Sequence, residues 1–597
     1  MRESTIRIGG ASGYWGDDPT AAAQLLQAGD LDYLVFDYLA EVTLSIMARA
    51  RSKDPSQGYA RDFVDVVMRR NLPEIARRQV RIISNAGGVN PQACAQAVRD
   101  MVAEMGLDLT AAVVLGDDLT DRASDLNARE MFTGEPAPDP SSVFSINAYL
   151  GAFPIARALT DGADIVITGR CVDSAVTLGA CIHAFNWDSN DHDRLAAGTL
   201  AGHILECGTQ ATGGNFTDWH LVADSLDRLG YPICEISANG TIDISKPEGT
   251  GGLVSIGTIA EQMLYEIADP QAYVVPDVVC DFSRVTIAQI GQDKVRLSGA
   301  RGHPPTPDYK VSLTYLDGWR AGSTASFYGS NAAAKAQSFC DAVFARARSA
   351  LRQMNLSDYT ETSVEIIGAG SQMGNTGLGA AAQEVVAKFA ARHPDKAGLE
   401  VLLRAASGMG LSAPPGLSGF FGTRARPSPL VRLFSFLVPK GNVPVTIDFG
   451  TTQIAADIVE GTPFDPAGLT RPAPPPRPAE ETDDMVTVPL EQLAWGRSGD
   501  KGDTANIGII ARHPDALPYI WHTLDQAAVA ARFAHVLDGE VSRYLLPGCN
   551  GMNVVLTRTL GGGGVASLRN DALGKGFAQV LLQTPVRVPR PLAEART

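Results

Sequence analysis

Polar and charged side chains follow five short apolar runs in the first third of the sequence. The runs are almost wholly apolar, which is typical of strands buried on both faces of a parallel sheet. Such a sheet gathers the carboxyl ends of its strands at one edge, where open α/β sheets bind ligands. Carboxylates, a guanidinium group and backbone N–H groups at this edge could supply a base, an anchor for an anion and an enolate stabiliser. We expect catalytic residues at Asp37, Asp173 and Arg170, and substrate-binding residues at Gly10, Ser12, Gly13, Asn85, Gly87, Gly88 and Asp117.

Turn geometry is the competing explanation for each of these positions, because Gly, Asn and Asp also dominate tight turns. The loop Gly9–Gly16 reads GGASGYWG and does not match the dinucleotide fingerprint G-x-G-x-x-G. Tyr14 and Trp15 stand where a cofactor would need close approach to the backbone, although Asp37 stands where a ribose-binding acid would. The spacing therefore argues against NAD. N–H groups at the start of the following helix could still hold a phosphate or carboxylate.

The middle of the chain holds further candidates. His203 and Glu206 are three residues apart and would share a helix face, as in some metal sites, but the alternative is a surface helix that ends at Gly208. Glu206 and His303 are predicted catalytic residues, and glycines and prolines surround His303 in GARGHPPTP. Cys207 would need a neighbouring base to act as a nucleophile, and none is evident. The polar loops TQATGGN and KPEGTGGLVS are predicted to bind substrate through Thr212, Gly213, Gly214, Thr250 and Gly251.

Two dense motifs lie near the end of the chain, WGRSGDKGDTANIG and LGGGGVASLRNDALGK. Glycine-rich loops with cations and hydroxyls can hold a phosphate or carboxylate, although neither motif is a P-loop. We predict anion binding by Arg497, Ser498, Lys501 and Arg569. The alternative is a pair of tight loops held together by Asp–Arg pairs. Because a proline-rich segment precedes both motifs, we expect the main site to lie in the N-terminal region, apart from them.

The elements that must position these residues suggest three folded parts. Residues 1–200 are predicted to form an α/β lobe with an open, mostly parallel, Rossmann-like sheet. Residues 201–461 are predicted to form a second α/β or α+β lobe, in which AAAQEVVAKFAARH is expected to be a helix. Residues 462–484 are rich in proline and predict a semi-rigid linker. Residues 485–597 are predicted to form a small α+β domain, in which AQVLLQTPV is expected to be a strand.

Composition narrows the class of protein. The chain has 597 residues, with 50 Lys and Arg against 66 Asp and Glu, a formal net charge of −16. This charge argues against nucleic-acid and anionic-membrane binding, which need a basic surface. The 8 cysteines contain no CxxC pair, and we find neither a secretory signal nor a membrane-spanning run. We expect a cytoplasmic homo-oligomer that binds a small molecule and neither nucleic acid nor a membrane.

Several motifs together resemble the acyclic terpene utilisation (AtuA) family. They include RIGGASGYWGDDP, NAGGVNP, TGRCVDSA, LECGTQATGGNF and PEGTGGLVS. The tail motifs RSGDKGDTANIG and LGGGGVASLR resemble the AtuA-type ferredoxin-like domain, here fused behind the linker. The resemblance spans nearly the whole chain. It implies a role in the catabolism of acyclic terpenes such as citronellol and geraniol, but it carries over no catalytic residues.

The resemblance and the strand-end residues together suggest a C–C or C–O lyase, or a hydratase, acting on a branched hydroxyacyl-CoA or carboxylated substrate. No cofactor is predicted beyond a CoA-linked substrate, no metal ligands are assigned, and the sequence leaves open whether a divalent metal assists. The alternative is a non-catalytic assembly or substrate-binding subunit of a catabolic complex, because no complete catalytic triad or metal cluster is evident. A nucleotide-dependent oxidoreductase is a third possibility.

Overall fold

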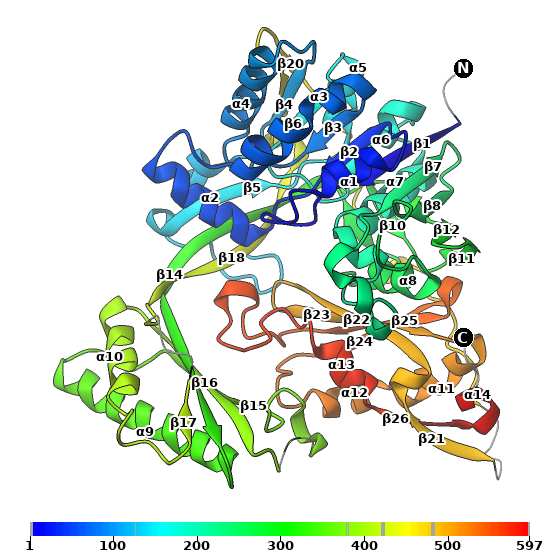
Figure 1. Cartoon of the computed structure of the whole chain (residues 1–597). Helices are drawn as coiled ribbons and strands as arrows, with labels where there is room; N and C mark the ends of the chain where they lie inside the picture. The colour runs from blue at the N-terminus through cyan, green and yellow to red at the C-terminus, as the bar shows by residue number, and fades with distance from the viewer. Residues whose placement is uncertain are drawn as a thin grey trace.

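Two large sheets and a C-terminal domain with a sheet of its own make up the molecule (Figure 1). The computed structural model describes residues 4–125, 127–377, 379, 381–419, 424–478 and 484–594. Within these ranges no helix is both long enough and apolar enough to span a membrane. All eight cysteines are free thiols.

The largest sheet has eleven strands, in the order β11-β12-β8-β7-β1-β2-β3-β6-β4-β19-β20. Its five central strands are parallel and correspond to the five apolar runs of the sequence, which confirms a parallel sheet at this place. These strands are β1 (Thr5–Gly10), β2 (Tyr33–Phe36), β3 (Arg81–Ser84), β6 (Ile165–Thr168) and β4 (Ala111–Leu115).

Antiparallel strands extend this sheet on both sides. Those beside β1 are β7 (Ile233–Ser237), β8 (Ile242–Ser245), β12 (Lys294–Ser298) and β11 (Thr286–Gly291), and those beside β4 are β19 (Thr446–Asp448) and β20 (Gln453–Ala455). The expected boundary near residue 200 therefore does not separate two sheets. Strands from both predicted lobes share backbone hydrogen bonds in one sheet.

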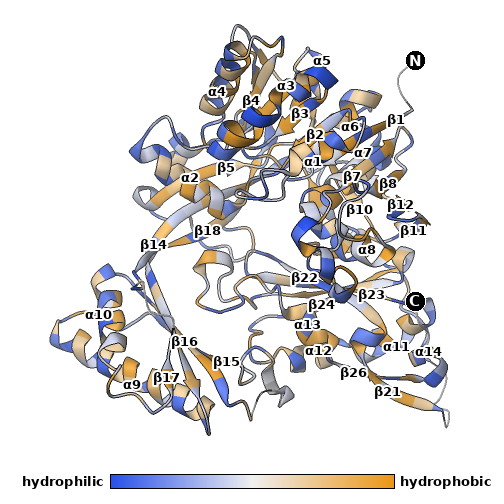
Figure 2. Ribbon diagram, viewed as in Figure 1, coloured by the Kyte–Doolittle hydropathy of each residue, from blue (hydrophilic) through white to orange (hydrophobic). Residues whose placement is uncertain are grey.

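Helices cover both faces of the eleven-stranded sheet. Side chains alternate along each strand, so Tyr33 and Val35 enter one core while Leu34 and Phe36 enter the other. Figure 2 shows the apolar residues concentrated on the central strands and the helix faces against them. The core of Leu34 includes α1 (Ala21–Gln27), α2 (Glu41–Lys53), α3 (Arg69–Arg78) and α4 (Pro91–Glu104). The core of Tyr33 includes α5 (Phe153–Thr160), α6 (Ala175–Phe185), α7 (His192–Leu205) and α8 (Ile256–Leu264).

The second large sheet is built on the 21-residue strand β14 (Asp308–Tyr328). The first half of β14 lies between β5 (Val143–Ala148) and β18 (Ser428–Pro439), and its second half pairs with β16 (Glu384–His393) and β17 (Leu417–Ser418). Beyond β16 lies β15 (Glu361–Ile367), and α9 (Ala332–Gln353) and α10 (Lys396–Ser407) pack on this end. A three-stranded sheet contains β9 (Tyr273–Val275), β10 (Val278–Asp281) and β13 (Arg301–His303).

The prediction of a helix at AAAQEVVAKFAARH is wrong, because this segment contains β16. Val385, Ala387 and Phe389 alternate as buried residues, which is the period of a strand. Pairing with β14 on one side and β15 on the other satisfies the backbone, and this outweighs the helix propensity of the alanines.

The C-terminal domain has an antiparallel sheet in the order β22-β23-β25-β24. The strands are β22 (Ala494–Lys501), β23 (Thr504–Ala511), β25 (Gly551–Leu556) and β24 (Val541–Leu546), with β21 (Met485–Pro489) and β26 (Pro585–Pro589) as a separate pair. The helices are α11 (Leu517–Thr523), α12 (Gln526–Arg532), α13 (Phe577–Leu582) and α14 (Arg590–Glu594). The strand expected at AQVLLQTPV is wrong in its first half, which lies in α13 and buries Val580 and Leu581 in the domain core.

The proline-rich linker is fixed to its neighbours where the structure describes it, at residues 462–478 and 484. Arg471 forms an ion pair of 2.6 Å with Asp269. His522 Nε2, in the C-terminal domain, lies 3.0 Å from the carbonyl oxygen of Pro475. The linker thus contacts both the N-terminal region and the domain that follows it.

Candidate functional site

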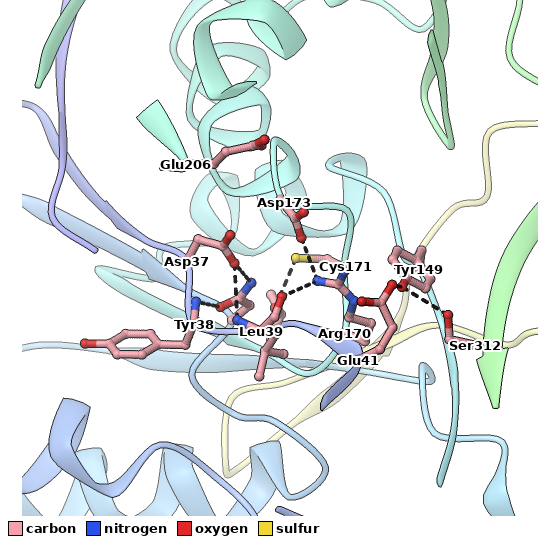
Figure 3. Close-up of polar contacts among 12 residues, drawn as sticks. Asp37, Tyr38, Leu39, Glu41, Tyr149, Arg170, Cys171, Asp173, Glu206 and Ser312 are labelled. Atoms are coloured by element: carbon pink, nitrogen blue, oxygen red, sulfur yellow. Dashed lines mark hydrogen bonds and ion pairs between the residues drawn. The ribbon is translucent and has the colours of Figure 1, made fainter. Parts of the chain in front are cut away.

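The carboxyl ends of β2 and β6 bring a buried arginine to two of the predicted carboxylates (Figure 3). Arg170 Nη1 donates hydrogen bonds to Asp173 Oδ1 at 2.6 Å and to the carbonyl oxygen of Leu39 at 3.0 Å. The side chain of Arg170 is only 4% exposed, whereas that of Asp173 is 25% exposed. Asp173 is therefore the member of this ion pair that solvent or a ligand can reach.

Asp37 follows β2 and is held by Asn85, which follows β3. Asn85 Nδ2 donates a hydrogen bond to Asp37, and its Oδ1 accepts one of 2.7 Å from the N–H of Tyr38. Burial and the neighbouring Asp173 carboxylate raise the pKa of Asp37 well above its usual range, against the opposing effect of Arg170. Burial therefore favours the protonated form of Asp37, whereas Arg170 and the hydrogen bond from Asn85 favour its ionised form.

His203 and Glu206 form a second acid–base pair, at the end of α7. His203 Nδ1 lies 2.9 Å from Glu206 Oε1, and the two side chains are 1% and 9% exposed. Burial raises the pKa of Glu206, although His203 acts in the opposite direction. Among the described residues, His203 Nε2 and Glu206 Oε2 are buried without a hydrogen-bond partner. Such atoms usually bind a water molecule or a ligand.

The helix that carries His203 is a core helix, so the expected surface helix is wrong. Every residue from Leu195 to Leu205 is buried, because α7 packs between the sheet, α6 and α8. The glycine loop after β1 packs on its end. A Cβ on Gly10 would lie 3.0 Å from the carbonyl oxygen of Leu205, and a Cβ on Gly13 would lie 2.9 Å from that of Glu206. These glycines allow the close approach that places Glu206.

Four residues near Arg170 form a network that was mostly missed from the sequence. Tyr149 donates a hydrogen bond to Glu41, and Ser312 donates one of 3.0 Å to Tyr149. Lys310 Nζ lies 3.9 Å from Glu41, and the Arg170 guanidinium lies 4.2 Å from the centre of the Tyr149 ring. Although burial opposes ionisation, Lys310, Arg170 and the Tyr149 hydroxyl lower the pKa of Glu41 to about 2.

The sequence carried a signal for only one member of this network. Glu41 lies four residues after Asp37 at the same strand end. Tyr149 follows β5, and Lys310 and Ser312 lie on β14, in the second sheet. Their approach to β6 depends on the packing of two sheets, which no local pattern records.

The other predicted residues of this edge have backbone partners. Asp117, after β4, accepts hydrogen bonds from the N–H of Arg170 at 2.8 Å and from Asn147 Nδ2 at 2.9 Å. Burial raises the pKa of Asp117 to about 7. Ser12 donates a hydrogen bond of 3.0 Å to the carbonyl oxygen of Asp37. Gly87 and Gly88 form the turn after β3, where the N–H of Gly87 donates to the carbonyl oxygen of Thr168.

Several predicted residues are not brought to this cluster. His303 lies on β13 rather than in a loop, with its ring 5.6 Å from that of Phe464. The two polar loops pack on each other and on residues 228–230. Thr212 donates to the carbonyl oxygen of Gly230 at 2.6 Å, and Gly251 donates to that of Arg228 at 2.9 Å. Gly213, Gly214 and Thr250 belong to the same loops, and substrate binding by these residues stays a prediction.

The C-terminal motifs are partly internal and partly directed at the N-terminal region. Ser498 donates to the carbonyl oxygen of Lys575 at 3.2 Å, and Arg569 donates to that of Val536 at 2.9 Å, so both bind their own domain. Arg497 donates to the carbonyl oxygen of Asn215, and Lys501 forms an ion pair of 2.9 Å with Glu266. Lys501 thus contacts the N-terminal region, and the expectation that the main site lies apart from these motifs stays a prediction.

Neither a nucleophilic cysteine nor a metal cluster stands out in the described ranges. Burial, followed by the charges of Glu206 and Glu266, raises the pKa of Cys207 well above its usual range, so this thiol stays protonated. No group of three or more His, Cys, Asp and Glu side chains there is arranged to hold a metal ion. The arrangement provides carboxyl groups of different acidity, a buried cation and partly exposed lysines.

Comparison with known families agrees with the motifs. Residues 6–449 match the model of the acyclic terpene utilisation family protein AtuA, and residues 488–587 match the AtuA ferredoxin-like domain. Comparisons with curated proteins and with solved structures give no match. The first match covers the strand-end cluster and both large sheets apart from β20, and the second covers the antiparallel sheet that carries Lys501. The chain therefore belongs to the acyclic terpene utilisation (AtuA) family and ends in an AtuA-type ferredoxin-like domain.

Proposed function

We propose that this protein is an enzyme of acyclic-terpene or branched-chain acyl catabolism that acts as a lyase or hydratase on a branched hydroxyacyl substrate, bound as its CoA thioester or as a carboxylate. The observation that carries the proposal is the buried carboxyl group of Asp37, held by Asn85 and with a raised pKa, beside the Arg170–Asp173 ion pair. Neighbouring carboxyl groups whose environments give them different acidities can divide the roles of acid and base.

Cleavage of a carbon–carbon bond uses these groups as follows. Asp173 accepts the proton of the substrate's β-hydroxyl group, and the oxygen becomes the carbonyl of a departing ketone. The Cα–Cβ bond breaks, and its electron pair forms the enolate of the acyl unit. Asp37 then donates its proton to the enolate carbon, which gives the second product. One proton is taken and one is returned, so no oxidant or reductant is needed.

Elimination of water needs the same two roles in a different order. A carboxylate removes the α-proton, the β-hydroxyl group leaves, and the carboxyl group of Asp37 protonates it as water. In both reactions negative charge develops on the acyl oxygen. Arg170, Lys310 and Lys501 supply positive charge near this place, and charges fixed before the reaction lower the barrier to enolate formation.

The test uses the purified full chain with 3-hydroxy-3-methylglutaryl-CoA and with the free diacid, each with and without a divalent cation. Mass spectrometry of the products distinguishes cleavage from elimination. We expect one of these reactions, together with saturable binding. No turnover and no binding would contradict the proposal. Isolation from a native lysate with stoichiometric partners, and without any turnover, would favour an assembly subunit instead.

A further inference from the structure

The hairpin of β22 and β23 ends beside the N-terminal region. Lys501 and Thr504 are the last pair of its ladder, with Gly502 and Asp503 between them. Lys501 Nζ lies 2.9 Å from Glu266, the second residue after α8, and the lysine side chain is 52% exposed. A C-terminal cation is thus held at the surface of the N-terminal region with room for another partner.

Lys575 is the second lysine at this junction, and it is more fully occupied. Its Nζ lies 2.9 Å from Glu266 and 3.0 Å from Asp500, and it also donates a hydrogen bond to the hydroxyl of Tyr265. Lys501 has one carboxylate partner, which it shares with Lys575. Of the two lysines, Lys501 is the one that could accept a ligand.

The partner of Lys501 lies close to the helix end that carries the acid–base pair. Gln262 Nε2, on α8, donates a hydrogen bond of 2.9 Å to the carbonyl oxygen of His203, and Glu266 follows four residues later. The surrounding protein disfavours the charge of Lys501, but Glu266, Asp173 and Glu206 outweigh this effect and raise its pKa well above the usual range. The lysine therefore shares an electrostatic environment with the strand-end carboxylates.

The glycine-rich loop holds the hairpin tip in this position. Asp503 Oδ1 accepts hydrogen bonds of 2.9 Å from the N–H groups of Leu560 and Gly562. Gly563 has φ 69° and ψ 157°, a conformation essentially restricted to glycine, and a Cβ there would collide with the carbonyl oxygen of Gly502. The segment Leu560–Gly563 therefore fixes the turn that carries Lys501.

The same loop is attached to the second large sheet. Arg392 on β16 donates hydrogen bonds to the carbonyl oxygens of Gly561, at 3.1 Å, and Ala566. Arg320 on β14 donates one of 3.0 Å to the carbonyl oxygen of Ser567. A continuous set of contacts thus runs from the second sheet through the loop to the hairpin tip.

We infer that the ferredoxin-like domain completes the site: it supplies Lys501 as a ligand for an anionic or carbonyl oxygen of the substrate, and the segment Leu560–Gly563 positions this lysine. The inference rests on the proposed function, and it assigns the substrate an oxygen that carries or develops negative charge. It also gives the glycine-rich motif a role as a support for Lys501 rather than as a separate anion site.

The placement of Lys501 can be tested without any ligand. The rate of acetylation of Lys501 by a water-soluble acetyl ester, measured by mass spectrometry, depends on its free-amine fraction. Asp173→Asn removes a carboxylate that favours the ammonium form, so this rate should rise about severalfold at a slightly alkaline pH. The matched control, Asp118→Asn, alters an exposed strand-end carboxylate and should leave the rate unchanged. Equal acetylation rates in the wild type, Asp173→Asn and Asp118→Asn would overturn the placement of Lys501 beside these carboxylates. If Asp173→Asn does not fold, Glu206→Gln serves as the test variant in its place.

Ligand binding has its own readout, which does not need turnover. Millimolar 3-hydroxy-3-methylglutarate should protect Lys501 of the wild-type protein from acetylation and should leave the rate at Lys396 unchanged. Lys396 is a suitable control because it is 54% exposed and also has one carboxylate partner. Protection without turnover would support Lys501 and contradict the proposed reaction, whereas turnover without protection would overturn the inference alone.

Kinetics separate the lysine from the loop that supports it. Lys501→Met should raise KM about 10- to 100-fold, and Lys501→Arg should raise it less, because the arginine keeps the positive charge. The KM of Lys396→Met should match that of the wild type. Gly563→Ala should raise KM in the same direction. Gly441→Ala is its control, since nothing lies within 4 Å of the added Cβ and its backbone is not in the left-handed region. An unchanged KM in Lys501→Met would contradict the role of the lysine, and one in Gly563→Ala would contradict the role of the loop.

Discussion

The backbone N–H of Arg170 donates a hydrogen bond of 2.8 Å to the side chain of Asp117. The two residues follow neighbouring parallel strands, β6 and β4, and this contact links the two strand ends. Asp117 is buried and also accepts a hydrogen bond from Asn147. Its carboxyl group therefore supports the backbone from which the Arg170 side chain reaches Asp173.

Asp117 should make the stability of the protein depend on pH. Burial raises its pKa from 3.8 to about 7, so the folded protein binds this proton more tightly than the unfolded chain does. The stabilisation is complete below about pH 4 and is lost as the pH rises through about 7. Asp117→Asn removes this titration. The contribution of Asp117 to the free energy of unfolding falls between about pH 5.5 and about pH 8 in the wild type. In Asp117→Asn the fall in the free energy of unfolding over this range should be smaller by about 2 kcal/mol.

Urea unfolding at the two pH values measures this difference directly. Asp108→Asn, at an exposed aspartate before β4, is the control, and its dependence on pH should follow that of the wild type. A curve for Asp117→Asn parallel to that of the wild type would show that Asp117 is already ionised in the folded protein at about pH 5.5.

Tyr149 should stabilise the junction between the two large sheets. Its hydroxyl bonds to Glu41 and accepts a hydrogen bond from Ser312. Tyr149→Phe removes one of the groups that keep Glu41 ionised. It also takes one hydrogen-bond partner from Glu41 and one from Ser312. We expect a loss of about 1–3 kcal/mol in the free energy of unfolding at neutral pH.

Tyr328→Phe, at an exposed tyrosine of β14, should change the same quantity by less than about 0.5 kcal/mol. Equal stability of both variants would mean that the hydroxyl of Tyr149 contributes nothing measurable to the junction.

Asp218 should hold the ferredoxin-like domain against the N-terminal region. Two nitrogens of Arg512 each lie 2.6 Å from its carboxylate, and Trp495 Nε1 donates to it at 2.8 Å. Asp218→Ala leaves a mostly buried guanidinium group and an indole N–H without this partner, which should weaken the contact by about 3–5 kcal/mol.

Chymotrypsin cleavage after Phe464 or Leu469 in the linker is a suitable measure, because the linker is fixed on both sides in the intact molecule. Asp218→Ala should be cut faster than the wild type, and Asp515→Ala, at an exposed aspartate, should not. Identical cleavage rates would contradict the importance of this ion pair for docking.

The fold was predictable where local pattern and burial agree. The strands β1, β2, β3, β4 and β6 are apolar along their whole length because both faces of the sheet are covered, and the sequence shows this directly. β16 was not predictable in the same way. Its alanines and charged residues fit an amphipathic helix, and only pairing with two distant strands makes it a strand.

The site was predictable to the extent that it depends on one sheet. Asp37, Asn85, Arg170 and Asp173 come together because parallel strands end at one edge. Tyr149 and Lys310 arrive from the second sheet, and Lys501 arrives from a domain behind the linker. Contacts between separately patterned parts leave no signal in residue spacing. The surroundings of these three residues therefore required the structure, although Lys501 itself was predicted to bind an anion from its motif.

The assignment of the buried carboxyl group of Asp37 as the proton donor is the centre of this account, and its replacement gives the most direct test. The kcat of full-length wild type, Asp37→Asn and Asp118→Asn should be compared on the substrate that the wild type converts, with circular dichroism as the control for folding. We predict that Asp37→Asn folds and loses about 100-fold or more in kcat, because an amide cannot donate the proton of a carboxyl group, while Asp118→Asn matches the wild type. Wild-type kcat in a folded Asp37→Asn protein would contradict the assignment of the acid and with it the proposed chemistry at this edge.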